Sequence, residues 1–523
     1  MKVLLIQPPI EDYYTTPIRN YPFGLLFIAS KLYDICDVEI IDLRQCKKPT
    51  QIKPDFLELE EYYTKNYSPF ATFHSYYRFG KKREEIEKII IEKKPDIVGI
   101  SCLFSTYFNE ALEIAYIVKS IKNTTKIIVG GNHPTLFPED TLKHSCIDFV
   151  IRGDGEDPFR LLVENLMKNK PVSSILGVCY KKDGEIVISE IFSNTTNTLD
   201  LKRELIPKEN YPYGKGFVAP VLTSKGCLYN CYFCGKPKTK FKLYNINDVK
   251  KDIEKLIQAG FDTIDFEDDY LDLTSENIIE LLTWLKEKKI NITAMNGIVP
   301  KINTITQRLV KESGFQRINI SLVDANEEIQ KDIDRAQFKD FNIILDRFIE
   351  TEIPIETHFI IGLPRQSLEH IIKTIIYLSQ KKVLLGPSIF YLAPGSKAFY
   401  EYLTNYKNFN MKYARSSAIF PVNNTYGRKE IVTLLKLSRF INFIKKHIDL
   451  IGRDINIYDL TKELKDSVDK TIMTALLKEG KLISYNKAKK TYEKDNFSEE
   501  VVQDFLKNLK FVRGYKTKQI CEF

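Results

Sequence analysis

The sequence predicts an α/β protein with three parts: an N-terminal doubly wound, Rossmann-like domain, a partial (β/α)6 barrel of the TIM type, and a helical C-terminal domain. Short apolar β-rich runs alternate with helical segments through the first 190 residues. A second alternation begins near Val218, and β-forming runs become rare after residue 405. We therefore expect domains over residues 1–190, 216–404 and 405–523, with a linker over 191–215.

The N-terminal part shows the elements of a parallel sheet in order. Strands are expected over Val3–Ile6, Val38–Leu43, Ile97–Ser101, Lys126–Val129 and Asp148–Ile151, and helices over Phe23–Leu32 and Ala111–Ile121. Residues 47–90 are rich in Tyr, Phe and charged residues, and we interpret them as an insertion between strands. Ligands of doubly wound sheets bind beyond the carboxyl ends of the strands, where two of these runs lead into glycines.

The middle part contains six β/α units. Strands are expected over Val218–Thr223, Thr263–Phe266, Ile292–Met295, Arg317–Leu322, Ile355–Ile361 and Ser388–Tyr391, and helices over Asp248–Gln258, Ser275–Lys288, Thr304–Glu312, Phe341–Glu350 and Ser367–Ser379. The last part is predicted to contain helices over Ile431–Ile444 and Ser498–Leu509. In a barrel of this kind the chemistry lies at the carboxyl ends of the strands.

Composition excludes several classes of protein. The chain has 523 residues, of which 43% are hydrophobic and 28% are charged, an ordinary balance for a globular protein. No apolar run approaches the roughly 18 residues of a membrane span, and the apolar start ends at two prolines without a cleavage site. We therefore expect a cytoplasmic protein. The net charge of +8 is mild and shows no basic cluster, so we expect no nucleic-acid binding.

Three of the nine cysteines, Cys227, Cys231 and Cys234, crowd into a CxxxCxxC segment after the first barrel strand. The others are scattered, which argues against a disulfide framework. Thiolates suit iron–sulfur clusters and zinc, and three of them can bind three irons of a [4Fe–4S] cluster while the fourth iron stays open. A structural zinc site needs a fourth protein ligand, and no His or Cys follows nearby. We therefore predict a cluster, with unligated or zinc-bound cysteines as the alternative.

The segment Cys227–Cys234 resembles the CxxxCxΦC motif of the radical S-adenosylmethionine (radical SAM) superfamily, with Phe233 at the aromatic position. The resemblance implies that the open iron binds the methionyl amine and carboxylate of S-adenosylmethionine. An electron from an external donor such as flavodoxin or ferredoxin would then release a 5′-deoxyadenosyl radical. Cofactors of this kind carry the hard chemistry, while the protein positions them and keeps water out.

Other strand ends of the barrel resemble the same superfamily. Asp268 and Asp269 follow the second strand in a segment similar to the FxDD element that holds the methionyl amine in members with a cobalamin domain. Either carboxylate suits an ammonium group, and a helix-capping acidic loop is the alternative. Further positions that resemble cofactor contacts are Asn296, Ser321, Arg335 and Gly362, and Pro394-Gly395-Ser396 resembles a turn after the sixth strand.

Segments of the N-terminal domain recur in the same order in cobalamin-binding radical SAM proteins. They include PDIVGIS at 95–101, GGNHP at 130–134 and GDGE at 153–156. Glycines at strand ends allow a large ligand to approach the backbone. Together with the barrel, the resemblance covers roughly residues 1–400. It implies that cobalamin contacts Ser101, Gly130, Gly131, His133, Gly153, Gly155 and Glu156.

One feature departs from many cobalamin proteins. The DxHxxG loop that supplies a lower axial His to cobalt is absent, and His133 lies in GGNHP instead. Either cobalamin binds without a protein His ligand or the domain no longer binds it. We favour the first, because the radical SAM branch commonly lacks that His.

The resemblance implies a cobalamin-dependent radical SAM C-methyltransferase that acts on an unactivated carbon of a small-molecule, lipid or peptide substrate through a 5′-deoxyadenosyl radical and methylcobalamin. The same architecture supports radical cyclisation or rearrangement, and no residue decides between these outcomes. A methylthiotransferase would need cluster-binding cysteines in the N-terminal domain. No basic RNA-binding tail follows the barrel, and the candidate cysteines are widely spaced: Cys36, Cys46, Cys102 and Cys146. The intact triad argues against a third class, a non-catalytic cobalamin-binding module.

Overall fold

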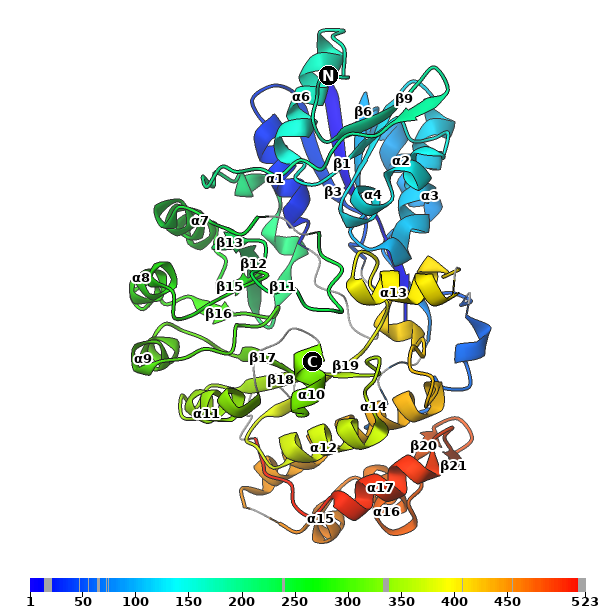
Figure 1. Ribbon diagram of the computed structural model, residues 1–523, viewed down its shortest axis with the longest axis vertical. Coiled ribbons are helices and arrows are strands. Elements are labelled where there is room, and N and C mark those ends of the chain that lie inside the picture. The colour runs from blue at the N-terminus through cyan, green and yellow to red at the C-terminus, as the bar shows by residue number, and fades with distance from the viewer. Residues whose placement is uncertain are drawn as a thin grey trace.

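The computed structural model describes residues 1–13, 21–46, 48–54, 56–63, 66–71, 73, 75–237, 240–332, 338–406, 408–453 and 455–515. The N-terminal sheet lies at one end of the long axis, the barrel in the middle and the C-terminal helices at the other end (Figure 1). The expected fold, a doubly wound sheet followed by a partial barrel and a C-terminal helical region, is confirmed.

The N-terminal sheet has seven strands in the order β10-β9-β8-β7-β6-β1-β3. They are β1 (Lys2–Gln7), β3 (Asp37–Asp42), β6 (Ile97–Ser101), β7 (Lys126–Gly130), β8 (Phe149–Ile151), β9 (Val178–Lys182) and β10 (Glu185–Val187). The strands from β3 to β8 are parallel, while β9 and β10 are antiparallel to their neighbours. The chain passes from β1 to β3 on one side and then crosses to β6 on the other. A topological switch point, where such sheets bind ligands, therefore lies between β1 and β6.

Both faces of this sheet are covered, which explains why its inner strands are apolar at almost every position. The covering helices are α1 (Phe23–Leu32), α2 (Arg83–Lys93), α3 (Phe108–Ile121) and α6 (Glu156–Met167). α1 and α6 pack on one face with Val3 and Leu5, and α2 and α3 pack on the other with Leu4 and Ile6. Successive side chains of a strand point to opposite faces, so the first strand contributes to both layers.

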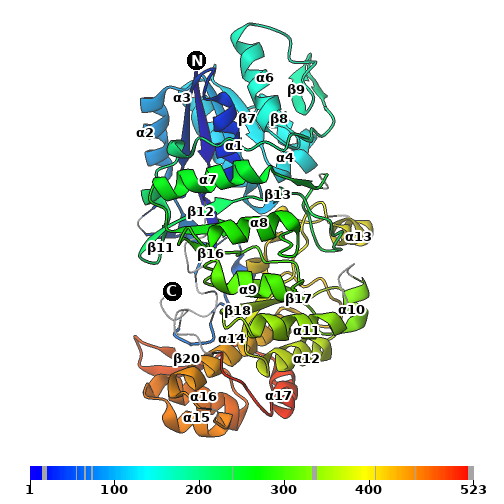
Figure 2. The ribbon, with the colours of Figure 1, turned by 90° about the vertical axis from the view of Figure 1, so that its left-hand side faces the viewer.

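Six parallel strands form the partial barrel. They are β12 (Gly216–Val221), β15 (Thr263–Phe266), β16 (Asn291–Thr293), β17 (Ile318–Val323), β18 (Ile355–Ile361) and β19 (Leu384–Ile389). The first three and the last three belong to two sheets, which an isolated bridge between Ile298 and Ile320 joins. The outer helices are α7 (Ile246–Gln258), α8 (Glu276–Leu285), α9 (Thr304–Glu312), α11 (Phe338–Ile349) and α12 (Leu368–Ser379). Figure 2 shows α7, α8 and α9 stacked along the outer side.

The sixth barrel strand differs from its predicted position. The sequence pattern predicts Ser388–Tyr391, but β19 begins at Leu384 and contains Pro387. β19 lies at the edge of its sheet, and an edge strand tolerates a residue that has no backbone N–H. The proline therefore hides the first half of this strand from a prediction that treats proline as a strand breaker.

Residues 191–215, predicted as a linker, are packed in the structure. Leu201 is buried in the core that the barrel strands and helices share. The buried guanidinium of Arg203 lies 2.6 Å from Asp252 Oδ2 on α7 and donates to the carbonyl oxygen of Pro220 in β12 at 2.9 Å. This connection therefore holds the first barrel strand and helix in a fixed relation to the end of the N-terminal sheet.

The C-terminal region contains a hairpin that the sequence pattern does not predict. Its helices are α14 (Arg428–Ile451), α15 (Ile457–Glu463), α16 (Ser467–Glu479) and α17 (Glu499–Asn508), and its hairpin strands are β20 (Ile483–Asn486) and β21 (Thr491–Lys494). The insertion predicted at 47–90 is shorter than expected, because α2 begins at Arg83 and packs on the N-terminal sheet as one of its covering helices. The insertion adds β4 (Thr50–Gln51) and β5 (Tyr77–Phe79), which form a small sheet with β2 (Ile10–Asp12).

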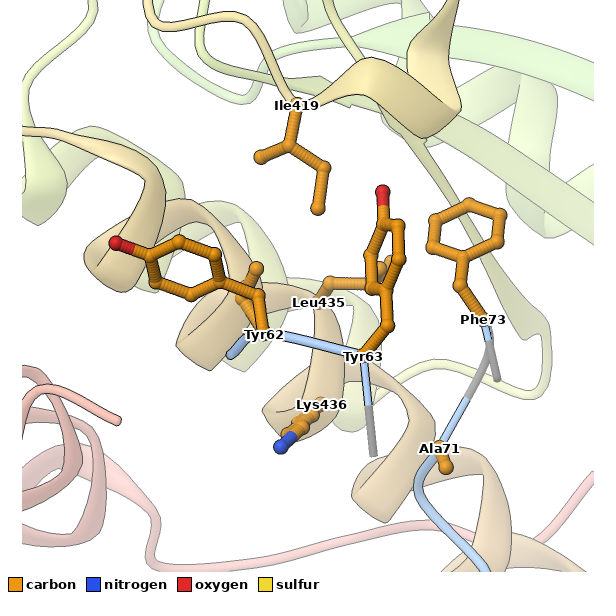
Figure 3. A pocket seen from close by; sticks show the side chains of 8 residues that line it. Tyr62, Tyr63, Ala71, Phe73, Ile419, Leu435 and Lys436 are labelled. Carbon is orange, nitrogen blue, oxygen red and sulfur yellow. The ribbon is translucent and has the colours of Figure 1, made fainter. Parts of the chain in front are cut away.

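Aromatic side chains of the insertion reach the C-terminal helices. Tyr63 and Phe73 gather around Leu435 of α14 below Ile419 (Figure 3). The space left between them is about 10 Å³, which is room for one water molecule at most. This contact is therefore a packed interface that ties the insertion to α14, not a binding pocket.

A buried ion pair joins the N-terminal domain to the segment before α14. Arg415 Nη1 lies 3.3 Å from Asp12 Oδ2, and both side chains are almost fully buried. Burial also raises the pKa of Glu110, whose Oε1 accepts the Glu11 N–H at 3.1 Å, to about 7. These groups border a cavity of about 100 Å³ that is lined by Glu11, Tyr76, Thr106, Asn109, Glu110, Glu113, Lys412 and Arg415.

The Glu110→Gln variant tests this buried carboxyl through the pH dependence of stability. A carboxyl whose pKa is raised on folding stabilises the native state below its unfolded pKa near 4.5, and that contribution is lost as pH rises through about 7. Urea unfolding should therefore show the variant more stable than wild type by on the order of 1–3 kcal/mol at pH 8, with little difference at pH 4.5. The exposed Glu84→Gln is the control. Equal stability of the Glu110 variant and wild type at both pH values would contradict a neutral buried carboxyl.

Candidate functional site

The three cysteines lie in a loop between β13 (Ser224–Lys225) and β14 (Lys242–Leu243), directly after the first barrel strand. Cys227 and Cys231 are half-buried and Cys234 is exposed. The Tyr229 N–H donates to Cys227 Sγ at 3.4 Å, and hydrogen bonds of this kind stabilise a thiolate ligand and tune a cluster. The loop therefore places the three thiols after the carboxyl end of β12, and their role as cluster ligands stays a prediction.

Asp268 fixes the start of this loop. The carboxylate is 1% exposed and accepts from the hydroxyls of Thr223 and Ser224 at 2.7 and 2.6 Å, and from their N–H groups at 3.0 and 2.6 Å. Burial raises the pKa of Asp268 to about 6, while these donors act in the opposite direction. The carboxylate therefore holds the two residues that lead into Cys227, and its oxygens face the loop.

The far end of the loop rests on the turn after β19. Gly235 allows the backbone to approach, because a Cβ there would clash with the carbonyl oxygen of Pro394. Gly395 has a φ of +88°, and a Cβ on it would lie 3.0 Å from Leu136 Cδ1 in the N-terminal domain. The cysteine loop, the turn and the N-terminal domain therefore meet at one point, which gives the predicted Pro394-Gly395-Ser396 turn a packing role.

Of the other barrel positions predicted from the resemblance, Ser321 lies in β17, Gly362 directly follows β18, and Phe233 lies in the cysteine loop. Phe233 packs against the hydrophobic cluster that contains Val323 and Leu363. Asp269 forms an ion pair with Lys236 of the cysteine loop, and its side chain is 28% exposed. Asn296 is exposed and donates to the Glu267 carbonyl oxygen at 3.0 Å. Arg335 lies outside the described residues.

A backbone kink follows Ser321. The register of β17 against β18 shifts between Ser321 and Val323, and Val323 has a φ of +72°. Positive φ is costly for a β-branched residue, and bulges near active sites redirect side chains. The kink is held by the buried pair of Asp324 and Gln366, and Gln366 Oε1 accepts the Gly362 N–H at 2.9 Å. One polar network therefore shapes both strand ends.

The glycines predicted to touch cobalamin have different roles. Ser101 and Gly130 end neighbouring strands and pair in register, and a Cβ on Gly130 would meet nothing within 4 Å. Gly131 and Gly153 have φ of +122° and +86°, and a Cβ on either would clash with a backbone carbonyl oxygen. Gly155 precedes α6, and a Cβ on it would lie 3.3 Å from Ile28 Cδ1. Only at Gly130, among these four glycines, does the backbone border open space.

His133 is a buried side chain of the helix α4 (Asn132–Leu136). It is 5% exposed, its ring centroid is 4.1 Å from that of Phe108, and its Nδ1 lies 3.0 Å from Ser105 Oγ. Burial lowers the pKa of His133 to about 4, so the ring is neutral at physiological pH. Its Nε2 is enclosed by protein without a hydrogen-bond partner in the described structure. This environment favours the structural interpretation of His133 over a direct chemical role.

Two carboxylates of the GDGE loop face the cysteine loop. Asp154 and Glu156 are 6% and 8% exposed, and Lys225 of β13 lies 2.7 Å from Asp154 Oδ1 and 3.4 Å from Glu156 Oε1. Glu156 Oε2 is buried and has no protein partner among the described residues. The resemblance predicts Glu156 as a site residue but gives no indication of Lys225, because their contact joins residues far apart in the chain and no local pattern marks it.

The lumen face of the second half-barrel is polar. Ser321 is in register with His358, and His358 with Gly386, so their side-chain positions share one face. Glu356 lies two residues before His358 on that face and forms an ion pair with Arg317. The His358 side chain is 35% exposed, whereas the opposite face of β18 is buried in the core. Alternating polar and apolar residues in β18 are the sequence signal that could have indicated this face.

No second cysteine cluster is present in the described part of the N-terminal domain. Cys102 and Cys146 are buried with α2 and α3, and Cys46 is exposed. Across the described ranges, no three His, Cys, Asp or Glu side chains surround a point that could hold one metal ion. The three thiols of the triad do not surround a single point either. A [4Fe–4S] cluster does not require this, because each thiolate binds a different iron. No helix in the same ranges is both long and apolar enough to cross a membrane.

Comparisons with known proteins match both halves of the site. A family model described as B12 binding domain matches residues 68–163, and one described as Radical SAM superfamily matches residues 221–378. An uncharacterized methyltransferase of Pyrococcus horikoshii, PH0819, is 27% identical over 462 residues, which are 85% of this chain and 92% of that protein. Each matched region contains one of the two loops that Lys225 joins.

Two solved structures share the fold. The cobalamin-dependent S-adenosylmethionine radical enzyme OxsB, with aqua-cobalamin and S-adenosylmethionine bound, has a TM-score of 0.60 at 15% identity over 92% of this chain and 71% of its own. The radical S-adenosylmethionine methyltransferase TsrM from Kitasatospora setae, with cobalamin and a [4Fe–4S] cluster bound, has a TM-score of 0.57 at 15% identity over 76% and 73% of the two chains. At this identity the likeness concerns the arrangement of the domains.

The Asp268→Ala variant tests how the cysteine loop is held. Removing the carboxylate leaves the donors of Thr223 and Ser224 without their buried acceptor, which should cost about 2–4 kcal/mol. We expect lower iron content per chain after anaerobic reconstitution and a lower unfolding midpoint. Asp272→Ala removes a less buried carboxylate of the same segment and should retain iron. Wild-type iron retention in the Asp268 variant would contradict the role given to this carboxylate.

Proposed function

The chain belongs to the cobalamin-dependent radical SAM methyltransferase superfamily, and we propose that it methylates an unactivated carbon of a substrate held between its barrel and its N-terminal domain. The observation that carries this proposal is the contact between the two loops expected to hold the cofactors. Lys225, two residues before Cys227, lies 2.7 Å from Asp154 in the GDGE loop. Two cofactors bound at these loops would share one reaction space.

The residues at each loop fit the groups that the family implies. Three thiols in an accessible loop match a cluster with one open iron. The open backbone at Gly130 and the buried acceptor Glu156 Oε2 suit a large ligand rich in hydrogen-bond donors, such as cobalamin. When bound, the cluster and S-adenosylmethionine supply radical hydrogen abstraction, and cobalamin supplies the methyl group.

The chain's own residues would orient S-adenosylmethionine at the strand ends. Asp269 is the proposed partner of the methionyl amine, because Asp268 already accepts from the cysteine loop whereas Asp269 is partly exposed. Its present partner, Lys236, belongs to the same loop and can move aside. Phe233 would pack beside the cofactor, and the remaining proposed contacts are Asn296, Ser321, Arg335 and Gly362.

For cobalamin we propose contacts at Ser101, Gly130, Gly131, Gly153, Gly155 and Glu156. His133 is proposed to support α4 from inside rather than to bind cobalt, because its ring packs against Phe108 and Phe137 and its Nδ1 lies 3.0 Å from Ser105 Oγ. Cobalamin would then bind without a histidine ligand from this chain. The cytoplasmic location and an external electron donor such as flavodoxin or ferredoxin stay predictions.

The substrate is proposed to lie against the polar lumen face of β17 and β18. Glu356 and Arg317 neutralise each other there. His358 offers a neutral ring, because burial of its Nε2 and the nearby charge of Arg317 lower the pKa of His358 to about 4. A neutral face with hydrogen-bonding groups fits a polar small molecule or a peptide group better than a lipid chain. A polar portion of the substrate would therefore be fixed here, while its reacting carbon faces the carboxyl ends of the strands.

The central test is anaerobic reconstitution followed by a 5′-deoxyadenosine assay and by absorption spectroscopy with hydroxocobalamin. We expect 5′-deoxyadenosine from wild type, its loss in Cys227→Ala, Cys231→Ala and Cys234→Ala, and its retention in the matched control Cys46→Ala. We also expect cobalamin absorption bands to remain with the protein after gel filtration. No 5′-deoxyadenosine from a chain with an intact cluster would exclude the enzyme proposal, and absent cobalamin bands would exclude the cobalamin part alone.

The His358→Ala variant tests the lumen face. Cells that carry wild type should contain a methylated metabolite that is missing without the gene, and the variant should lower its amount by at least about tenfold. The purified variant should still hold its cluster and form 5′-deoxyadenosine, because His358 lies on β18, which belongs to a different sheet from β12, the strand before the cysteine loop. His447→Ala on α14 is the control. A wild-type metabolite level in the His358 variant would contradict substrate binding on this face, and a cyclised product without an added methyl would favour the alternative reaction.

A further inference from the structure

Lys225 is the residue by which the cysteine loop reaches the N-terminal domain. Its backbone pairs with Lys242 across the β13–β14 ladder, two residues before Cys227. Its side chain extends the other way, to 2.7 Å from Asp154 Oδ1 and 3.4 Å from Glu156 Oε1. One side chain therefore links the strand that leads into the triad with the loop proposed to hold cobalamin.

The surroundings make this ion pair strong. The side chains of Asp154 and Glu156 are 6% and 10% exposed, and that of Lys225 is 27% exposed. Charges at such depth are poorly screened, in contrast to surface pairs, which contribute little. A second cation, Lys242, is near but donates to the carbonyl oxygens of Asn194 and Thr196 at 3.0 and 2.8 Å. Among the described residues, Lys225 is therefore the cation that forms ion pairs with both buried carboxylates.

The link is rigid at both ends. The residues before Lys225, Thr223 and Ser224, are held by Asp268 through hydrogen bonds of 2.6–3.0 Å. At the other end, Asp154 Oδ2 accepts the Asn194 N–H at 2.8 Å. The position of the GDGE loop is therefore linked through Lys225 to the segment that leads into the first cysteine.

Glu156 is the residue through which a bound ligand would affect the contact between Lys225 and the GDGE loop. Its Oε1 takes part in the contact with Lys225, while its buried Oε2 has no protein partner in the described structure. A buried acceptor left unsatisfied is unfavourable, so a donor group of a bound corrinoid would stabilise Glu156 in this position. The same carboxylate would thus respond to the corrinoid on one oxygen and hold Lys225 with the other.

We propose that Lys225 is a positioning residue that couples the two cofactor sites, so that cobalamin bound at the GDGE loop raises the affinity of the cluster site for S-adenosylmethionine, and the reverse. The coupling rests on the proposed function, because it requires both cofactors. Coupling between binding sites is reciprocal, so it can be measured from either side.

The experiment measures the dissociation constant of S-adenosylmethionine for the anaerobically reconstituted, full-length protein, with and without saturating hydroxocobalamin. For wild type we expect cobalamin to tighten binding about fivefold or more, the usual lower range of such coupling. In Lys225→Met the two constants should become equal, and Lys225→Arg should restore most of the difference. The control Lys250→Met removes a lysine that pairs with Glu280 between α7 and α8, and it should behave as wild type.

Each outcome has one meaning. A Lys225→Met protein that keeps the wild-type ratio overturns the proposal. A wild type that binds both ligands but shows equal constants overturns it too and leaves the proposed function intact, whereas a wild type that binds no cobalamin contradicts both. If Lys225→Met does not retain its cluster, Asp154→Asn provides the same test from the other domain. Loss of coupling is expected there as well, and an unchanged ratio would overturn the proposal.

Discussion

The geometry of the candidate site depends on a buried carboxylate at the start of the cysteine loop. Asp268 follows the second barrel strand and accepts from Thr223 and Ser224, which lie in the segment after the first strand. A charge at 1% exposure is tolerated only because these donors surround it. The donors are backbone and hydroxyl groups of Thr223 and Ser224, so the carboxylate fixes the backbone from which the three thiols extend.

Two further contacts turn this local anchor into a link between domains. Lys225, which follows the segment fixed by Asp268, forms ion pairs with Asp154 and Glu156. Gly395 lets the turn after β19 pack against Leu136 of the N-terminal domain. Both contacts join the ends of strands, where doubly wound sheets and barrels bind their ligands. The fold therefore places the two edges that are proposed to bind the cofactors against each other, as the proposed methyl transfer to a carbon radical requires.

Local patterns predict the parts of this arrangement that depend on local spacing. The triad is spaced within eight residues, and the alternation of β and α segments indicates both sheets. Contacts between distant residues are not written in such patterns: the Lys225–Asp154 pair joins two domains, and the polar face around His358 follows from the register of β17 and β18. Asp268 and Asp269 are neighbours with the same chemistry, and only burial separates the anchor from the exposed carboxylate. The hairpin β20–β21 was missed because no apolar alternation marks its short strands.

The most direct measurement of the account is the distance between the two metal centres in the holoenzyme. Pulsed EPR on protein that contains a reduced cluster and Co(II) cobalamin reports the dipolar coupling between their unpaired electrons. If the cysteine loop and the GDGE loop hold their cofactors as proposed, the two signals should be strongly coupled through space, and Lys225→Met should broaden the distance distribution. Two independent signals without dipolar coupling would contradict a shared reaction space between the barrel and the N-terminal domain.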